Sequence, residues 1–169
     1  MDTLDDLLRR LEQLNDIGSA LSNERNIDAL LEKILLAAKT ITHADGGTLY
    51  RIDEAGEQLR FEILRTDSLG IAMGGSTGKP IAFPPLPLHL DDGSPNLSMV
   101  AAYSALKGQT VNIADAYRAE GFDFSGTRAF DARTGYRSTS FLTVPMMNHE
   151  GVVIGVLLTS VAATPKVKL

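Results

Sequence analysis

The residues best suited to bind a small molecule lie in the second half of the chain, where aromatic side chains occur among hydroxyl and guanidinium groups. Apolar walls with a few converging hydrogen-bond donors are typical of a small-molecule pocket, and an arginine can pair with an anionic group. We therefore predict a pocket between a sheet and residues 98–139. The predicted ligand-binding residues are Tyr103, Asn112, Tyr117, Phe122, Phe124, Thr134, Tyr136 and Ser138.

The same segment allows a second interpretation, in which its aromatic side chains only form the hydrophobic core over one face of the sheet. In that case Asp123 and Asp131 pair with Arg128 and Arg133, and no ligand is needed. The residue types do not identify the ligand, because they suit many flat or anionic molecules.

No group of residues indicates catalysis. Residues 73–80 contain the glycines and lysine of a phosphate loop, but the first glycine is missing and Pro80 replaces the hydroxyl residue that would hold magnesium. His43, His89 and His149 have no partners at metal-ligand spacing. The chain has no cysteine, which excludes thiol catalysis and zinc–thiolate sites. We expect a non-enzymatic chain without catalytic residues, metal or cofactor.

Length and charge limit the class of protein further. The 169 residues suffice for one domain with a hydrophobic core. A net charge of -5 without a dense basic run argues against nucleic acid as a partner. No apolar run approaches the roughly 20 residues of a membrane helix, and the first residues lack the features of a signal peptide. We therefore expect a cytoplasmic protein that binds neither nucleic acid nor membrane.

Two helices are predicted at the start of the chain. In residues 3–21, leucines alternate at spacings of three and four, the a and d pattern of a coiled coil. These leucines are Leu4, Leu7, Leu11, Leu14 and Leu21. We predict a homodimer through this helix, although Gly18 weakens it. Asn26 is a suitable N-cap for a second helix, whose apolar stripe runs from Ile27 to Ile41 and packs on a core.

After residue 41 the hydrophobic period changes from helical to two, which predicts strands. Residues 47–52 and 58–65 form one hairpin, with Leu59, Phe61 and Ile63 on one face. The later predicted elements are an edge strand at 81–83, a helix at 98–106, a strand at 110–113, a helical turn at 117–120 capped by Asp115, an irregular segment at 122–136, and a hairpin of strands at 141–147 and 152–161. The last strand is apolar on both faces, which places it in the centre of the sheet. Hairpins with helices elsewhere predict an α+β fold around an antiparallel sheet.

Several motifs in the second half of the chain resemble those of GAF domains. They are VNI at 111–113, DAY at 115–117, GFDFSGT at 121–127, FD at 130–131, TGYR at 134–137, VPM at 144–146 and the segment 148–155. The FPPLPL segment at 83–88 is also similar. The resemblance extends over roughly residues 12–160. It is closest to GAF domains fused to bacterial HD-type phosphohydrolases, cyclases and sensor kinases.

This resemblance implies a GAF/PAS-like fold, with the N-terminal helices on one face of an antiparallel sheet of about six strands. It also implies a sensory or regulatory domain of a signal-transduction protein, which binds a small molecule and controls an attached effector domain. The alternative is a GAF-like module that dimerises and binds nothing. We expect a coiled-coil-like helix at 1–21, the GAF domain at 22–163, and a linker or the end of an excised segment at 164–169.

Two features narrow what the resemblance implies. Free methionine-sulfoxide reductases share the GAF fold but need cysteines, which this chain lacks. In cyclic-nucleotide GAF domains an Asn-Lys pair follows the last strand, and Val161 and Ala162 stand at that place here. We therefore expect cyclic AMP and cyclic GMP to bind weakly or not at all.

Overall fold

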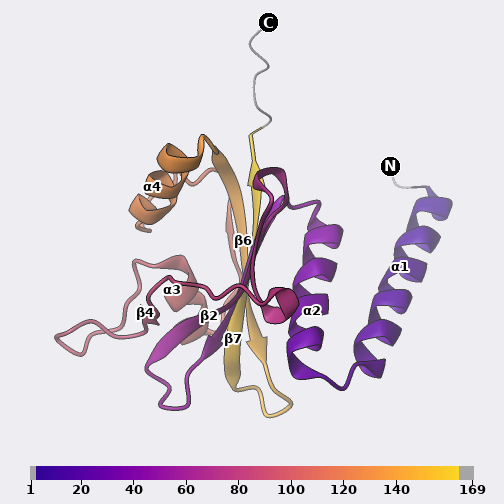
Figure 1. Cartoon of the computed structure of the whole chain (residues 1–169), viewed down its shortest axis with the longest axis horizontal. Coiled ribbons are helices and arrows are strands. Elements are labelled where there is room, and N and C mark those ends of the chain that lie inside the picture. The colour runs from indigo at the N-terminus through magenta and orange to yellow at the C-terminus, as the bar shows by residue number, and fades with distance from the viewer. Residues whose placement is uncertain (1–2, 164–169) are drawn as a thin grey trace, which may run out of the picture.

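Seven strands form one sheet in the computed structural model, which describes residues 3–163 (Figure 1). The segment 164–169 lies outside the described residues. The strands are β1 (Gly46–Ile52), β2 (Gln58–Thr66), β3 (Ile71–Gly74), β4 (Leu86–Pro87), β5 (Val111–Ile113), β6 (Ser138–Met147) and β7 (Val153–Ala162). Their order is β3-β2-β1-β7-β6-β5, with β4 also paired to β2, and all pairs are antiparallel. The predicted α+β fold is confirmed.

Capping residues determine where the first two helices begin. Helix α1 (Leu4–Asn23) follows Thr3, whose hydroxyl accepts a backbone N–H of the first turn. Helix α2 (Ile27–Thr42) follows Asn26, whose side-chain oxygen accepts the Ala29 N–H, so the predicted cap is confirmed. The remaining helices are η1 (Asp67–Leu69), η2 (Gly75–Thr77), α3 (Val100–Lys107) and α4 (Ser125–Thr134).

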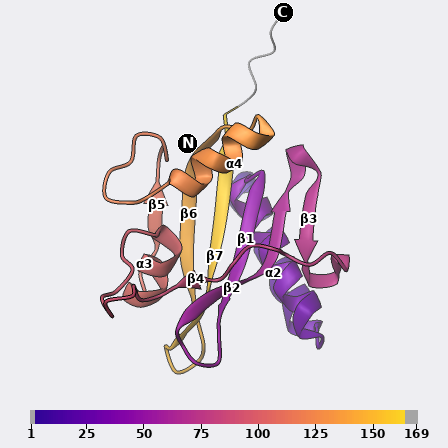
Figure 2. The same cartoon turned by 60° about the vertical axis from the view of Figure 1, so that its left-hand side comes forward.

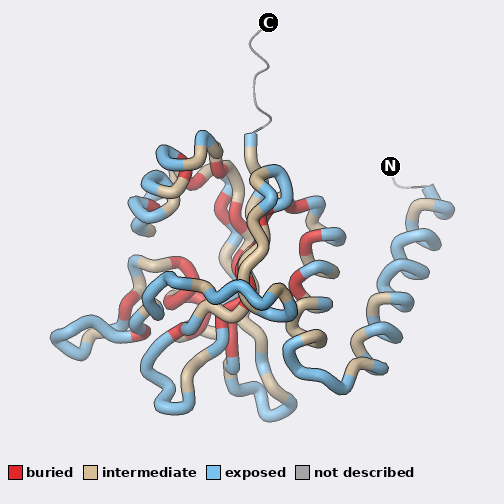
Figure 3. The backbone as a smooth tube through the Cα atoms, viewed as in Figure 1, coloured by how far each residue is buried: buried red, intermediate tan, exposed pale blue. Residues whose placement is uncertain are grey.

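The helices cover both faces of the sheet. Figure 1 shows α2 against one face and α3 and α4 against the other, and we call these the α2 face and the α4 face. Helix α1 lies beside α2, on the side away from the sheet, so both N-terminal helices lie on the same side, as predicted. Buried residues concentrate at the contacts of the sheet with α2 and α3 and at the start of β6. Most of α1 is exposed (Figure 3).

Each face of the sheet has its own hydrophobic core. On the α2 face, Leu35 of α2 packs against Leu49 and Ile63, and all three are almost completely buried. On the α4 face, Leu59 and Val156 pack with small residues of α3. Small side chains bring a helix close to a sheet, so α3 closes the lower part of this face tightly.

A β-bulge in β2 changes which residues face which core. Leu49 pairs with Ile63, but the next residue, Tyr50, pairs with Phe61, so one residue of β2 is left over. Because a one-residue shift reverses the side-chain alternation, Ile63 lies on the α2 face while Leu59 and Phe61 pack with the core of the α4 face. The prediction that these three residues share one face is wrong, since alternation alone does not reveal a bulge.

Strand β7 lies between β1 and β6 in the middle of the sheet, as its two apolar faces predicted. Near its start, a Cβ atom on Gly155 would lie 2.4 Å from the backbone oxygen of Tyr50 and 2.6 Å from the methyl group of Met146. Any larger residue would push β1 away from β7. Glycine is therefore required for the close approach of these strands.

Three local predictions are wrong. Residues 81–83 form no strand, because the outer edge of β2 is paired by β3 and β4, which precede and follow that segment. Residues 117–120 form no helix: residues 116–118 make a turn, in which the Asp115 carboxylate accepts the Tyr117 N–H. Residues 122–136 are not irregular throughout, because they contain α4. Helix α4 has a single large apolar residue, so it shows no hydrophobic period.

Two neighbouring leucines of α2 allow a matched test of this packing. Leu35 is completely buried, whereas Leu36 is 44% exposed. We expect Leu35→Ala to lower the free energy of unfolding by about 2–5 kcal/mol, because it leaves a cavity against the sheet. Leu36→Ala should lower it by less than about 1 kcal/mol. Urea denaturation followed by circular dichroism measures both, and equal losses would contradict the described packing.

Candidate functional site

A cavity of about 580 Å³ lies on the α4 face, between the sheet and α4. Its floor consists of residues from β1, β2, β6 and β7, and its roof is one side of α4. Phe83, Leu86 and Met99 complete the wall. Figure 2 shows α4 crossing the upper ends of the central strands, which is where it roofs the cavity. The roof belongs to the segment 98–139 in which we predicted a pocket.

Hydroxyl groups and aromatic rings share the floor of the cavity. Thr48 and Tyr50 come from β1, Thr66 from β2 and Ser160 from β7. The ring of Tyr50 packs on Phe61, with centroids 4.7 Å apart. Burial raises the pKa of the Tyr50 phenol, and a hydrogen bond with Thr48 only partly opposes this. The phenol therefore stays neutral and can act only through hydrogen bonds and its ring.

The roof of the cavity is formed by α4 and the residues that follow it. Ala129, Phe130 and Arg133 lie on the side of α4 that lines the cavity. The ring of Phe130 lies 6.2 Å from that of Tyr136, in an edge-to-face arrangement. Aromatic pairs of this geometry attract each other beyond their burial. Two aromatic residues are therefore available to contact a flat ligand from above.

A hydrogen bond from Tyr136 ties the end of this roof to the start of β1. The Tyr136 hydroxyl donates to Oδ2 of Asp45 at 2.6 Å. Asp45 also accepts the N–H of Ser68 at 2.9 Å and its hydroxyl at 2.6 Å. Partial burial opposes ionisation of Asp45, but these hydrogen bonds outweigh it and lower the pKa of the carboxyl. Burial and the Asp45 carboxylate together raise the pKa of Tyr136.

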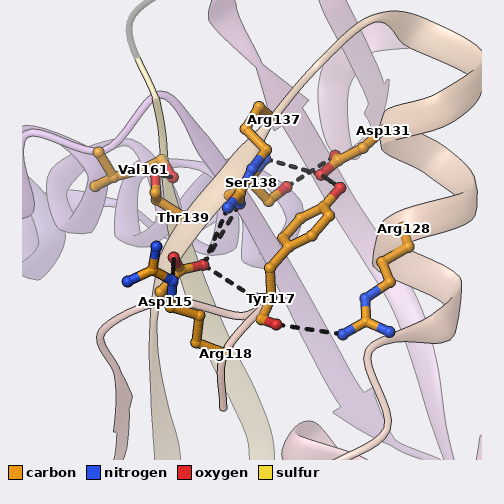
Figure 4. Close-up of polar contacts among 9 residues, drawn as sticks. All are labelled: Asp115, Tyr117, Arg118, Arg128, Asp131, Arg137, Ser138, Thr139 and Val161. Carbon is orange, nitrogen blue, oxygen red and sulfur yellow. Dashed lines mark hydrogen bonds and ion pairs between the residues drawn. The ribbon is translucent and has the colours of Figure 1, made fainter.

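A buried carboxylate on α4 forms a second connection between roof and sheet. Asp131 is only 3% exposed. It accepts the hydroxyl of Tyr117 at 2.7 Å, and the backbone N–H and hydroxyl of Ser138 at 2.8 and 2.9 Å (Figure 4). A buried charge is tolerated only when such donors replace its water. The predicted pairing of Asp131 with an arginine is therefore wrong.

Tyr117 is held between two arginines. The guanidinium of Arg137 lies 3.6 Å from the centre of the Tyr117 ring, and that of Arg128 lies 5.4 Å from it. Arg137 also contacts Asp115 at 3.4 Å (Figure 4). Cations over an aromatic face are attracted to it. Tyr117 is thus fixed as a donor to Asp131, and it supports the roof from outside the cavity.

The structure separates the eight predicted ligand-binding residues into three groups. Tyr136 and Ser138 line the cavity. Tyr117 and Thr134 support α4: Thr134 donates its hydroxyl to the carbonyl of Phe130. The others lie elsewhere. Tyr103, Phe122 and Phe124 belong to a chain of aromatic contacts that ends on Phe141 of the cavity wall, and Asn112 is exposed on β5.

Most cavity residues that sequence reasoning missed belong to strands. Thr48, Tyr50, Thr66, Leu158 and Ser160 come from β1, β2 and β7, which are far apart in the sequence. The hydroxyl residues inside these otherwise apolar strands were the available signal. A threonine or serine that interrupts a buried strand needs a hydrogen-bond partner or a cavity beside it.

Two further features, a metal-ligating cluster and a membrane-spanning helix, are absent from the described residues 3–163. These residues contain no group of three or more His, Asp or Glu side chains that could hold a metal ion. None of their helices is long and apolar enough to cross a membrane.

Solved structures with the same fold are GAF domains and their relatives. The GAF domain of an Acinetobacter phosphoenolpyruvate-protein phosphotransferase superposes with a TM-score of 0.62 at 17% identity, covering 90% of this chain and 77% of that chain. Free methionine-R-sulfoxide reductase from Neisseria meningitidis, solved in complex with its substrate, gives a TM-score of 0.58 at 20% identity, covering 89% and 71%. The fold is therefore that of a GAF domain.

The model of the GAF domain family matches residues 26–160, and the chain belongs to this family. GAF domains are regulatory or sensory domains of signalling proteins and are generally non-catalytic, although the Neisseria protein is an enzyme. A cGMP-specific 3′,5′-cyclic phosphodiesterase of Drosophila ananassae is 29% identical over 151 residues, and one of Drosophila melanogaster is 28% identical. These matches cover 86% of this chain but only 11% and 12% of the relatives.

The buried carboxylate can be tested against an exposed one near the same helix. Asp131→Asn replaces the charge that three donors share, so we expect the free energy of unfolding to fall by about 1–3 kcal/mol. Asp123 is exposed and accepts hydrogen bonds from the N–H and the hydroxyl of Ser125, which the side-chain oxygen of asparagine can also accept, so Asp123→Asn should cost less than about 0.5 kcal/mol. Urea denaturation checks both. A loss for Asp131→Asn no larger than for Asp123→Asn would show that this connection does not stabilise the fold.

Proposed function

We propose that this chain is a non-catalytic regulatory GAF domain that binds a small molecule in the cavity beneath α4 and controls an attached effector domain. The main observation in support of this proposal is the cavity itself. It has aromatic and aliphatic walls with a few hydroxyl groups, and no carboxylate is among the described residues that line it. Pockets of this size and composition are typical of small-molecule sites.

The way α4 is attached supports a change of state on binding. The polar contacts of Asp131 and Tyr136 described above join the roof to the sheet. Ser138 contributes both to the cavity wall and to the contact with Asp131. A ligand that bonds the Ser138 hydroxyl competes with Asp131 for it, and a ligand that prefers one arrangement of α4 increases the population of that arrangement.

The start of β6 connects the cavity to the end of β7. Arg137, next to Ser138, accepts the N–H of Ala163 with its carbonyl oxygen at 2.9 Å. Thr139 donates its hydroxyl to the carbonyl of Val161 at 2.7 Å. A shift of residues 137–139 on ligand binding therefore reaches the last described residues of the chain. This is the route by which the domain would act on an effector domain that follows it.

The kind of effector is a further part of the proposal. The resemblance to GAF domains fused to HD-type phosphohydrolases, cyclases and sensor kinases favours one of these activities in the full-length protein, in the cytoplasm of a bacterium. The curated relatives are phosphodiesterases. The chain spans about a ninth of their length, so their catalytic activity is not transferred to this chain.

A neutral aromatic probe tests whether the cavity binds small molecules. We expect indole to shift the amide resonances of Tyr50, Phe61 and Leu158 saturably, with a Kd of about 1 mM, the order expected for so few atoms. Two alanines of α4 give a matched pair. Ala129 lines the cavity and Ala132 does not, so Ala129→Trp should abolish binding, whereas Ala132→Trp should leave it unchanged.

The absence of saturable shifts at cavity residues, or equal binding by the two tryptophan variants, would overturn the cavity as the site. Cyclic GMP belongs in the same titration because the relatives act on it. We expect no submicromolar affinity, because Val161 and Ala162 replace the Asn-Lys pair of cyclic-nucleotide GAF domains.

A second proposed role, dimerisation through α1, rests on a separate observation. Five leucines of α1 are about half exposed or more: Leu4, Leu7, Leu8, Leu11 and Leu14. The side of α1 turned toward α2 carries Ile17 and the polar residues Arg9, Glu12, Gln13 and Asp16. Leu21, the last leucine of the predicted seam, is partly buried. The leucine stripe thus points away from the rest of its own chain. A second copy of the helix would bury it, as in a coiled coil, and this supports treating residues 1–21 as a segment separate from the GAF domain.

Replacing Leu7 and Leu14 by Asp should give a folded monomer. Each fully buried leucine contributes about 1.5–3 kcal/mol, and a carboxylate cannot replace it in the seam. Gln13→Asp with Ala20→Asp is the matched control, because it adds the same charges at the same spacing on the opposite side of α1. Light scattering measures the mass. A monomeric wild type at high micromolar concentration, or a dimeric leucine variant, would contradict the proposal.

A further inference from the structure

Three strands bring a glycine and two hydroxyl residues into one row at the upper end of the cavity. Gly46 of β1 pairs directly with Thr66 of β2 on one side and with Ser160 of β7 on the other. Thr66 and Ser160 line the cavity. Residues paired across antiparallel strands point to the same face, so the two hydroxyls flank a position that has no side chain.

The missing side chain gives the Ser160 hydroxyl the room to lie over Gly46, on the side of Thr66. A Cβ atom on Gly46 would lie 2.5 Å from the Ser160 Oγ and 3.7 Å from the Thr66 Oγ1. Neither hydroxyl makes a side-chain hydrogen bond within the described part of the chain. Polar groups at a cavity floor without a protein partner are available to a ligand.

Arg133 supplies a positive charge at the same end of the cavity. It lines the cavity from the last turn of α4 and has no ion pair or hydrogen bond through its side chain within residues 3–163. Three residues later, Tyr136 bonds Asp45, the neighbour of Gly46. This contact places the end of α4 above the row of hydroxyls, and Figure 2 shows α4 reaching across the ends of these strands.

The carboxylate of Asp45 does not face the row of Thr66, Gly46 and Ser160 from inside the cavity. Asp45 is not among the residues that line the cavity. Both of its carboxylate oxygens accept hydrogen bonds from Ser68, and one also accepts the hydroxyl of Tyr136. Among the described residues that line the cavity, the one side-chain charge besides Arg133 is that of Arg65, whose guanidinium is paired with Glu32 of α2.

The opposite end of the cavity is apolar. The rings of Phe61 and Phe83 lie 5.5 Å apart, and Leu86 and Met99 complete the wall beside them. A ligand that fills the whole cavity therefore has an apolar end near Phe61 and an end at Gly46 that accepts hydrogen bonds and meets a guanidinium.

We infer that the ligand of this cavity is an amphipathic monocarboxylate, with its carboxylate held by Thr66, Ser160 and Arg133 and an aromatic or branched apolar group packed against the touching rings of Phe61 and Phe83. This inference rests on the proposed function. Arginine with hydroxyl donors matches the two oxygens of a carboxylate, and the uncharged apolar walls disfavour a second charge.

Two probes of almost equal shape test the charge of the ligand. The acid 3-phenylpropionate carries a carboxylate, and 3-phenylpropanamide carries a neutral amide in its place. Titrations followed by amide resonances should give at least tenfold tighter binding for the acid, with the largest shifts at Gly46, Thr66 and Ser160. Equal affinities, tighter binding of the amide, or acid-induced shifts confined to other parts of the chain would overturn the inference.

Substitutions of Arg133 and Ser160 test whether these residues bind the carboxylate of the acid. Arg133→Gln should weaken binding of the acid about tenfold and leave the amide unchanged, and Ser160→Ala should weaken the acid severalfold. Arg118→Gln is the control, because Arg118 is exposed and lies outside the cavity. An unchanged acid affinity in Arg133→Gln would overturn the inference. If indole binds in the cavity and the acid does not, the carboxylate inference alone fails; if neither binds, the proposed function fails with it.

Discussion

The fold depends on a central strand that is apolar on both faces. Strand β7 can be buried only if material covers it from two sides, because each exposed apolar side chain would face water. Helix α2 provides one cover, directly from the start of the chain. The other cover has to come from the long connection between β3 and β6, which contains α3 and α4. The two covers differ: α3 packs tightly through alanines, whereas α4 stands off and leaves the cavity.

The distance between α4 and the sheet follows from what attaches it. Helix α4 has a single large apolar residue, Phe130, so hydrophobic burial alone does not hold it in place. Its position is set by the carboxylate of Asp131, which reaches Ser138 and Tyr117. Polar contacts of this kind are directional and few, so they fix a helix without filling the space beneath it. The same interaction thus leaves the cavity open and attaches its roof through a few polar contacts, which is what the proposed function requires.

The start of β6 joins the cavity to the end of β7, and the proposed function gives these two places separate roles. Ser138 faces the cavity, and its neighbours Arg137 and Thr139 hold the end of β7. A change at the ligand therefore does not need to cross the hydrophobic core to reach the last described residues. The helix α1 lies on the opposite side of the molecule (Figure 1), and five of its leucines are about half exposed or more. The proposed ligand site and the proposed dimer contact are accordingly on surfaces that do not overlap.

The sequence by itself determined the features that depend on neighbouring residues: the cap at Asn26, the period of α2, the hairpins, and the central position of β7. It also indicated Tyr136 and Ser138, which line the cavity. Only the tertiary structure decided the bulge that moves Phe61 to the α4 face, and the row of Thr66, Gly46 and Ser160. The physical reason is the same for both. Strand register and helix placement are set by contacts between segments distant in sequence. Local hydrophobic periodicity does not predict which residues of distant segments pair with each other.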